Sequence, residues 1–285
     1  MGDLHPLAAR EYKLLLEPAA FADDPLRAAA TFWKRHLAPL SAKTAGAEAS
    51  GAPTEHRERR VQYWDTARRA LGDADYTLRQ RQTIEAGAQK PLRLALKLRS
   101  PDFFVAAQAA ARVGKGRLTG ADIAFEEDIA PLAVTLDRAR AEFAERPSIR
   151  SRFALTIEGK IADGDVPETL DEARQLFPTL AADIRAGGKR LQPGPDIREI
   201  TLKGAAFAFG AGTGDVTITL WYFGKAKQPK VAEVSFKCPL KGGQMPRRDA
   251  LAALHLFNNM QSKLGDWINR HQTSKTELAL PERKR

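Results

Sequence analysis

Glu11 and Lys13 stand two positions apart in the stretch AREYKLLLEP, which covers residues 9–18. In a β-strand, side chains two positions apart point to the same face, so this acid and this base lie side by side. A carboxylate can hold a divalent cation, and a lysine ammonium can bind a phosphate oxygen. The pair therefore fits either an ordinary solvent-facing strand or the first two groups of a site for an anion and a metal.

Long cationic side chains recur on one face of most other strands that the sequence predicts. On a single strand this pattern is typical of the wet side of an antiparallel sheet. Its repetition favours a closed sheet whose interior holds cations, and such an interior needs water or an anion because unpaired buried charge is costly. Several phosphates in a row would suit it. The cations are Arg79, Arg81, Arg93, Lys97, Arg99, Arg152, Lys160, Lys203 and Lys237, and isolated acids among them are Glu158 and Glu233.

The overall charge points in the same direction. The chain has 285 residues, a formal net charge of +10 and a pI near 9.8, a balance that favours polyanionic partners such as nucleic acid or phosphorylated small molecules. Cys238 is the single cysteine, which excludes an intramolecular disulfide and a zinc site of several thiolates. The first residues show no signal-peptide pattern, and no apolar run approaches the roughly eighteen residues of a membrane span. We therefore expect a cytoplasmic protein without a membrane partner.

Alternation and turn residues predict the elements that must position these charges. The stretch KPLRLALKLRS at 90–100 alternates strictly, with Leu94 and Leu96 on one face and Arg93 and Lys97 on the other. We expect helices over about 24–38, 123–145 and 246–271, a flexible loop over about 41–57, and hairpin turns at 210–214 and 225–229. Together these elements predict one α+β domain over residues 1–285.

Five short motifs follow one another in an order that resembles the CYTH superfamily, also called triphosphate tunnel metalloenzymes. They are REYKLLLEP, VQYWDTARRAL, YTLRQRQ, LRLALKLRSPD and VAEVSFKC. The family has an N-terminal E-x-E-x-K strand, a Y-[FY]-D-T strand end, L-R-x-R and L-x-L-K strands, and a late E-x-E strand. The resemblance covers most of the chain. It implies a closed or nearly closed antiparallel β-barrel of about eight strands, which forms a tunnel surrounded by helices.

The resemblance also implies a substrate, a cofactor and residue roles. Members of the family hydrolyse triphosphates or cyclise ATP with a divalent metal, so the substrate would be a triphosphate or polyphosphate and the cofactor Mg²⁺ or Mn²⁺. Glu11 and Glu233 would hold the metal, and with Lys13 they would form the catalytic set. The phosphate-binding residues would be Lys13, Arg79, Arg81, Lys97, Arg99, Arg152 and Lys237.

Three carboxylates of the family pattern are missing from this chain. The first motif has Ala9 in place of a glutamate, the late motif has Ser235, and Trp221 stands where many members have an aspartate. Glu126 and Glu127 lie where the family often has another acid, but their register is open. Because the cations are better preserved than the acids, catalysis with a metal is in question.

Three functions are therefore open. The first is a divalent-metal-dependent hydrolase, a triphosphatase, in which Glu158 on a neighbouring strand could replace a missing acid. The second is a catalytically degenerate tunnel protein that binds a polyphosphorylated ligand or nucleotide without turnover. The third is a basic barrel that binds RNA or DNA, which the net charge alone allows. A homodimer is open in each case.

Overall fold

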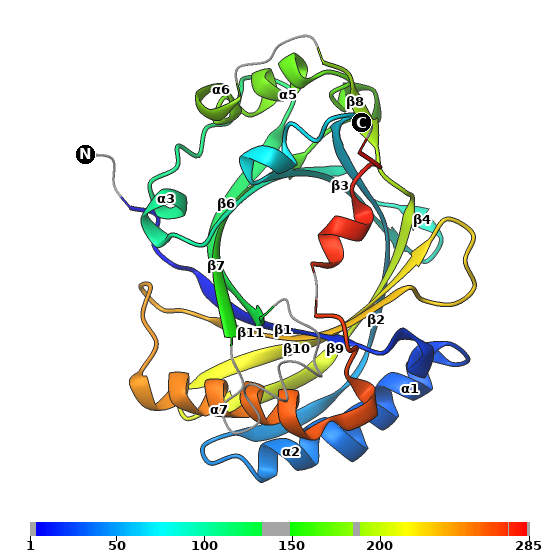
Figure 1. The fold of residues 1–285 in the computed structure, drawn as a ribbon, viewed down its shortest axis with the longest axis vertical. Helices are drawn as coiled ribbons and strands as arrows, with labels where there is room; N and C mark the ends of the chain where they lie inside the picture. Colours follow the sequence, from blue (N-terminus) through cyan, green and yellow to red (C-terminus); the bar gives the residue numbers. More distant parts are fainter. Residues whose placement is uncertain (1–3, 133–148, 185–188, 273, 284–285) are drawn as a thin grey trace.

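A closed β-barrel forms the centre of the molecule (Figure 1). The computed structural model describes residues 4–132, 149–184, 189–272 and 274–283. The ring runs in the order β3-β5-β7-β6-β1-β11-β10-β9-β2, and β2 pairs back with β3 to close it. Its strands are β1 (Ala9–Leu16), β2 (Glu48–Thr66), β3 (Tyr76–Glu85), β5 (Arg93–Ser100), β6 (Thr119–Pro131), β7 (Ile149–Lys160), β9 (Ile197–Phe209), β10 (Gly212–Phe223) and β11 (Val231–Pro239).

The predicted α+β barrel is confirmed, with two differences in detail. The ring holds nine strands rather than about eight, while the short strands β4 (Ala88–Gln89) and β8 (Leu191–Pro193) extend it beside β3 and β2. Its neighbours pair antiparallel except for β1 and β6, which run parallel. This pair sets Ala9 opposite Glu126 and Glu11 opposite Asp128. Two strands far apart in the sequence therefore present their charges at the same level of the barrel.

Most apolar side chains of the strands point out of the barrel and most charged ones point in, because each strand alternates; Tyr63 and Trp221, which line the cavity, are exceptions. On β1, Tyr12 and Leu14 are fully buried, whereas Glu11 and Lys13 line the interior. The hydrophobic core therefore lies between the sheet and the helices around it (Figure 1). The helices beneath β9, β10 and β11 are α1 (Pro25–Phe32), α2 (Ala38–Ala42) and α7 (Arg247–Lys263), and those around the rest of the ring are α3 (Phe103–Ala107), α5 (Leu170–Leu176) and α6 (Leu180–Asp183).

Two predicted helices form with altered ends. The helix expected over 24–38 starts at α1, where Asp24 accepts the Arg27 backbone N–H at 3.0 Å, and continues through a π-helical turn (Trp33–Leu37) into α2. The helix expected over 246–271 ends earlier, since α7 stops at Lys263 and Gly265 adopts a left-handed φ of 56°. Among the helices in the described part of the chain, none is both long and apolar enough to cross a membrane.

The flexible loop predicted over 41–57 is wrong for most of its length. Strand β2 begins at Glu48 and pairs with β9, with a shift in register between Gly51 and Glu55. Gly51 has a φ of 67°, and a Cβ atom there would lie 2.1 Å from the backbone oxygen of Gly204. The glycine and proline in this stretch therefore mark a β-bulge and a close backbone approach, not a loop.

The helix predicted over 123–145 is also wrong in its first part, because residues 119–131 form strand β6. Residues 133–148 lie outside the described part of the chain. In β6, Phe125 and Ile129 are buried in the core while Glu126 lines the barrel interior. Acidic residues are rare in strands, so the run Glu126-Glu127-Asp128 concealed this alternation.

The Tyr63-Trp64-Asp65-Thr66 motif has a structural explanation at the end of β2. The fully buried carboxylate of Asp65 accepts the backbone N–H groups of Thr66 at 2.7 Å and of Leu71 and Gly72 at 2.9 Å each. It therefore fixes the turn that leads from β2 toward β3, and so the seam where the barrel closes.

We expect Asp65→Ala to lower the free energy of unfolding by about 2–4 kcal/mol, because three backbone donors lose their acceptor. Denaturant unfolding measures this change. The control is Asp73→Ala in the same turn, which removes an exposed ion pair to Arg283 at 2.7 Å and should cost less than about 1 kcal/mol. Equal losses in the two variants would contradict this role of Asp65.

Candidate anion and metal site in the barrel

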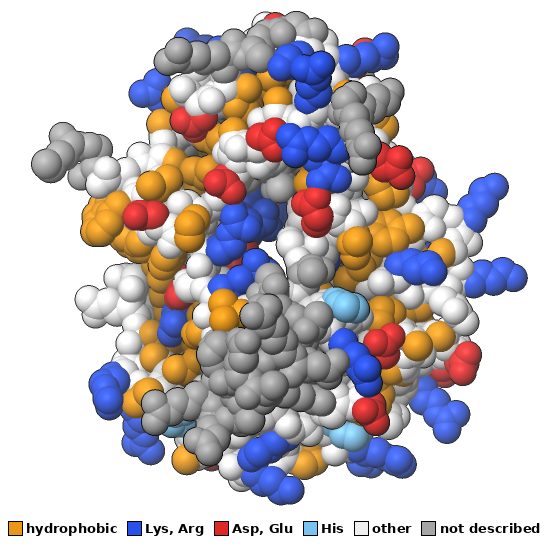
Figure 2. All heavy atoms as spheres, in the orientation of Figure 1, with side chains coloured by type: hydrophobic (Ala, Val, Ile, Leu, Met, Phe, Trp, Pro, Cys, Tyr) orange, Lys and Arg blue, Asp and Glu red, His pale blue; other side chains and the backbone are white. Residues whose placement is uncertain are grey.

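The barrel interior is a cavity of about 420 Å³ with more cationic than acidic side chains. Ten Lys or Arg side chains line it together with seven carboxylates, and Figure 2 shows blue side chains inside the central opening. An interior with excess positive charge is suited to an anion. The cations are Lys13, Arg59, Arg79, Arg81, Arg93, Lys97, Arg99, Lys203, Lys237 and Lys275.

The structure brings most of the predicted phosphate-binding residues together in this cavity. Arg152 is the exception, because it lies beside smaller pockets at the barrel mouth, where its guanidinium meets Asp75 at 3.1 Å. Arg150 lines the same mouth and was not singled out from the sequence; its buried Nε has no hydrogen-bond partner. The mouth therefore continues the cationic surface of the cavity.

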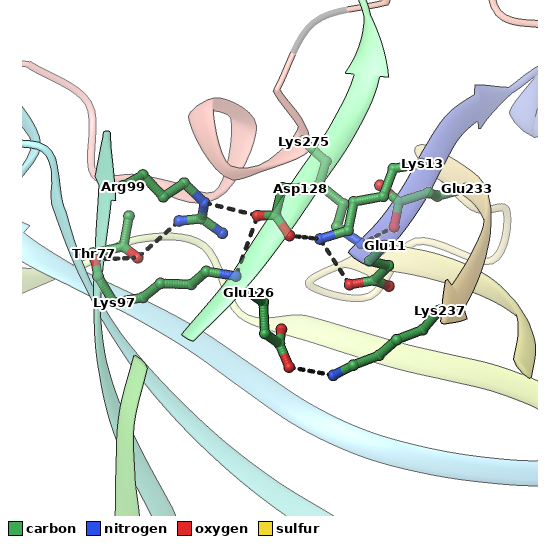
Figure 3. A network of polar contacts seen from close by, with 10 residues as sticks. All are labelled: Glu11, Lys13, Thr77, Lys97, Arg99, Glu126, Asp128, Glu233, Lys237 and Lys275. Atoms are coloured by element: carbon green, nitrogen blue, oxygen red, sulfur yellow. Dashed lines mark hydrogen bonds and ion pairs between the residues drawn. The ribbon is translucent and has the colours of Figure 1, made fainter. Parts of the chain in front are cut away.

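Three carboxylates gather on the cavity wall (Figure 3). We call Glu11, Glu126 and Asp128 the carboxylate trio; one oxygen of each lies within 4.8 Å of the others. The parallel pairing of β1 with β6 produces the trio, because it places Glu126 beside Ala9 and Asp128 beside Glu11. The neighbouring strand thus supplies acids next to the position where Ala9 replaces the glutamate of the family motif.

Asp128 is the centre of a group of ion pairs. Its carboxylate lies 2.7 Å from Lys13 Nζ, 3.2 Å from Lys97 Nζ and 3.4 Å from Arg99 Nε. Burial opposes the charge of Asp128, but these three cations outweigh burial and hold the pKa of Asp128 well below its usual range. Lys13 also lies 3.0 Å from Glu11, so one ammonium bridges two members of the trio.

The surroundings of Asp128 shift the pKa values of Lys13 and Lys97 in opposite directions. Burial disfavours the charge of Lys13, but Asp128 and Glu11 outweigh it and raise the pKa of Lys13. Burial lowers the pKa of Lys97 to about 8. The carboxylate of Asp128 opposes this shift, whereas the nearby cations Arg99 and Lys13 add to it. Lys97 is therefore a cation whose charge changes in the physiological range.

Glu158 forms a second centre of ion pairs in the same cavity. Its carboxylate meets Arg81 at 3.1 Å and Arg79 at 3.2 Å, and it also pairs with Arg93. It does not belong to the trio of possible metal ligands. The structure therefore gives no support to Glu158 as a replacement for a missing metal ligand.

The late strand holds Glu233 in the cavity, although outside the trio. Glu233 accepts a hydrogen bond from Lys275 Nζ at 2.5 Å, and Lys275 comes from a short 3₁₀ turn (Lys275–Ala279) that crosses the barrel opening (Figure 1). Trp221, where the family pattern has an aspartate, donates its Nε1–H to Glu199 at 2.9 Å, and its ring lies 5.0 Å from Lys275 Nζ. The two predicted metal ligands, Glu11 and Glu233, therefore have different partners.

Besides Arg150 at the mouth, sequence reasoning missed six inward-facing charges, which are Arg59, Asp122, Asp128, Glu199, Asp215 and Lys275. Arg59 and Glu199 form an ion pair at 2.9 Å across β2 and β9. The consecutive acids Glu126, Glu127 and Asp128 interrupt the alternation on β6, so no clear local signal marked Asp128. No local pattern could have paired Arg59 with Glu199, because 140 positions separate them.

We expect the Lys97 ammonium of the metal-free protein to titrate near pH 8, below the value of about 10.4 for an exposed lysine. Lysine side-chain NMR measures the midpoint, and Lys97→Arg identifies the resonance. Since the cavity loses a positive charge as the pH rises through 8, binding of inorganic triphosphate should weaken over this range. Lys97→Arg stays charged and should remove that dependence. A midpoint at the ordinary lysine value would contradict the expectation.

Comparisons with known proteins give matches among solved structures only. No protein-family model and no curated protein matches this chain. HpAC1 from Hippeastrum, proposed to be an adenylyl cyclase and described as having a dominant triphosphatase activity, is 13% identical; the match covers 94% of this chain and 93% of that one with a TM-score of 0.44. A protein of Bacillus halodurans proposed to be an adenylate cyclase is 7% identical, with 95% and 97% covered and a TM-score of 0.39. The PH1819 protein of Pyrococcus horikoshii OT3 is 13% identical, with 94% and 97% covered and a TM-score of 0.35. All three TM-scores lie below 0.5.

Proposed function

We propose that this chain binds a triphosphate or linear polyphosphate inside the barrel and hydrolyses a phosphoric anhydride bond with a divalent cation. The observation that supports this most is the carboxylate trio beside Lys13, Lys97 and Arg99 in a closed cavity with excess positive charge. Neither the trio nor the cations alone would suffice, because phosphoryl transfer needs both charge neutralisation and positioning. The resemblance to the CYTH superfamily implies the same chemistry.

The donor chemistry of the trio fits Mg²⁺ or Mn²⁺, which prefer carboxylate oxygens and share their coordination with substrate phosphates and water. When bound there, the cation would polarise a phosphoryl oxygen and lower the pKa of a water molecule. Glu11, Glu126 and Asp128 would hold it. Lys13 lies on two of these carboxylates and would turn toward the phosphate that shares the site.

The chain's own cations would bind and orient the substrate. Lys13 and Lys97 offer point charges to phosphate oxygens, and Arg99 offers a planar fork. Thr77 steadies Arg99 by accepting a hydrogen bond from its NH1 at 3.2 Å. As charge develops on the leaving phosphate oxygen, these side chains stabilise it, because the strands hold them around the substrate.

Glu233 is the carboxylate that we assign to the attacking water. It faces the cavity close to Lys13, and Lys275 fixes its orientation through the 2.5 Å hydrogen bond (Figure 3). In this role Glu233 accepts a proton from the water while the water oxygen bonds to the terminal phosphorus. The bond from that phosphorus to the anhydride oxygen breaks, and this oxygen leaves with the rest of the phosphate chain.

A second candidate is a protein that binds the same ligand without turnover. It is favoured by Lys13, which already compensates two members of the trio, and by Ala9, Ser235 and Trp221 at positions where the family has acids. Both candidates share the anion site. They differ in whether a divalent metal ion can displace Lys13 from the carboxylates of the trio.

We expect Glu126→Gln to lower phosphate release from inorganic triphosphate by about 100-fold or more, because one metal ligand loses its charge. Triphosphate binding in a chelator should persist, since the variant removes a negative charge and leaves every cation in place. Phosphate release is followed with Mg²⁺ and with Mn²⁺, on inorganic triphosphate, ATP, GTP and thiamine triphosphate. Asp163→Asn, an exposed carboxylate in a turn outside the barrel, is the matched control.

The same panel separates the alternatives. Tight triphosphate binding without turnover under either metal supports the binding protein. Absence of triphosphate binding by the wild type contradicts both candidates. Binding of single strands or duplex with a steep salt dependence would then favour the nucleic-acid barrel.

A further inference from the structure

The arginine hub, which we define as Glu158 with Arg79, Arg81 and Arg93, occupies its own part of the cavity. Glu158 comes from β7, and the arginines come from β3 and β5. Ala95 on β5 is in register with Arg79 on one side and with Glu158 on the other. Because alanine is small, the two charged side chains can meet across the intervening strand. The Glu158 side chain is only 15% exposed, so solvent screens these contacts weakly.

The hub has more hydrogen-bond donors than one carboxylate can satisfy. Each guanidinium offers five N–H donors, and Arg79 Nε is buried without a hydrogen-bond partner. Burial lowers the pKa of Arg81, and the neighbouring charge of Arg79 lowers it further against the opposing effect of Glu158. Burial disfavours the charge of Arg79, but Tyr63, Glu158 and Glu199 outweigh it and raise the pKa of Arg79. The three guanidiniums still offer more N–H donors than one carboxylate can accept, so they retain capacity for an additional anion.

The hub and the trio lie at different levels of the barrel. In the pairing of β6 with β7, Asp128 is opposite Arg152 and Asp122 is opposite Glu158. Asp128 lies six positions from the level of Glu158, a rise of roughly 20 Å, and Glu126, which is opposite Ala154, lies four positions from it, a rise of roughly 13 Å. A phosphate chain that starts at the trio and follows the cavity therefore runs toward the hub.

We propose that Glu158 limits the length of the phosphate chain that the barrel accepts, which makes it a specificity-determining residue; this inference rests on the proposed function. The far end of a triphosphate would bind guanidinium N–H groups of the hub that face the cavity. A fourth phosphate would meet the carboxylate of Glu158, which repels it. Glu158 also already pairs with the guanidiniums that would have to bind this phosphate. Wild-type protein thus selects triphosphate over longer chains through an internal negative charge.

The test compares binding of linear tripolyphosphate, tetrapolyphosphate and long-chain polyphosphate to metal-free protein in a chelator, so that turnover cannot occur. Isothermal titration calorimetry gives the affinities. Wild type should bind tripolyphosphate at least as tightly as the longer anions. Glu158→Gln keeps the shape of the side chain and removes its charge. It should shift the ratio of affinities toward tetrapolyphosphate by about tenfold or more.

Two single variants serve as controls. Glu158→Asp keeps the charge and should keep the wild-type preference. Glu85→Gln makes the same charge change on β3, at an exposed side chain paired only with Lys90, and should change nothing. If Glu158→Gln fails to fold because three arginines lose their counter-ion, the double variant with Arg93→Gln restores the charge balance of the hub and should show the same shift.

The outcomes distinguish this inference from the function beneath it. If wild type binds tripolyphosphate but the folded Glu158 variants keep the wild-type affinity ratio, the length limit is overturned and the proposed function stands. A wild type that prefers long chains overturns the limit as well. If wild type binds none of the three anions, the proposed function falls and the length limit falls with it.

Discussion

A single carboxylate that holds three cations is the interaction on which this barrel depends, and it occurs twice among the described residues, at Asp128 and at Glu158. Strands that close into a ring bring their inward side chains together whether or not a ligand is present. Ten cations in one cavity would repel one another strongly in a medium of low dielectric constant. Asp128 and Glu158 each stabilise three cations without a ligand, and other carboxylates of the cavity, such as Glu199 and Glu233, pair with more of them. The remaining excess of positive charge is available for an anion.

The same arrangement explains why the hydrophobic core lies outside the ring. The outer faces of β9, β10 and β11 pack on α1, α2 and α7 through aromatic residues such as Phe207, Phe236 and Phe257. Folding is thus driven largely by apolar surfaces outside the cavity. The hydrophobic core outside the ring stabilises the fold. The interior of the barrel can therefore hold charged side chains that a hydrophobic core would exclude.

Much of this architecture was visible in the sequence, and the missing parts have a common cause. Alternation on single strands revealed the cationic face, and the order of motifs led to the closed barrel and to most of the cavity cations. What sequence reasoning could not supply was pairing between distant strands. Glu126 and Asp128 matter because β6 lies beside β1, and Glu158 meets Arg79 because Ala95 stands between them. The local errors, at 41–57 and 123–131, arose where glycine, proline or acidic residues concealed a strand.

The parallel seam between β1 and β6 also bears on how the chain folds. Strand β1 precedes the other described strands in the sequence, yet its two neighbours begin at Thr119 and Val231. Contacts between residues so far apart form slowly, because the chain loses much conformational entropy before these contacts stabilise it. The carboxylate trio, which spans this seam, cannot assemble before β1 has found β6. In this protein, the candidate metal site therefore exists only once the parallel seam between β1 and β6 has formed.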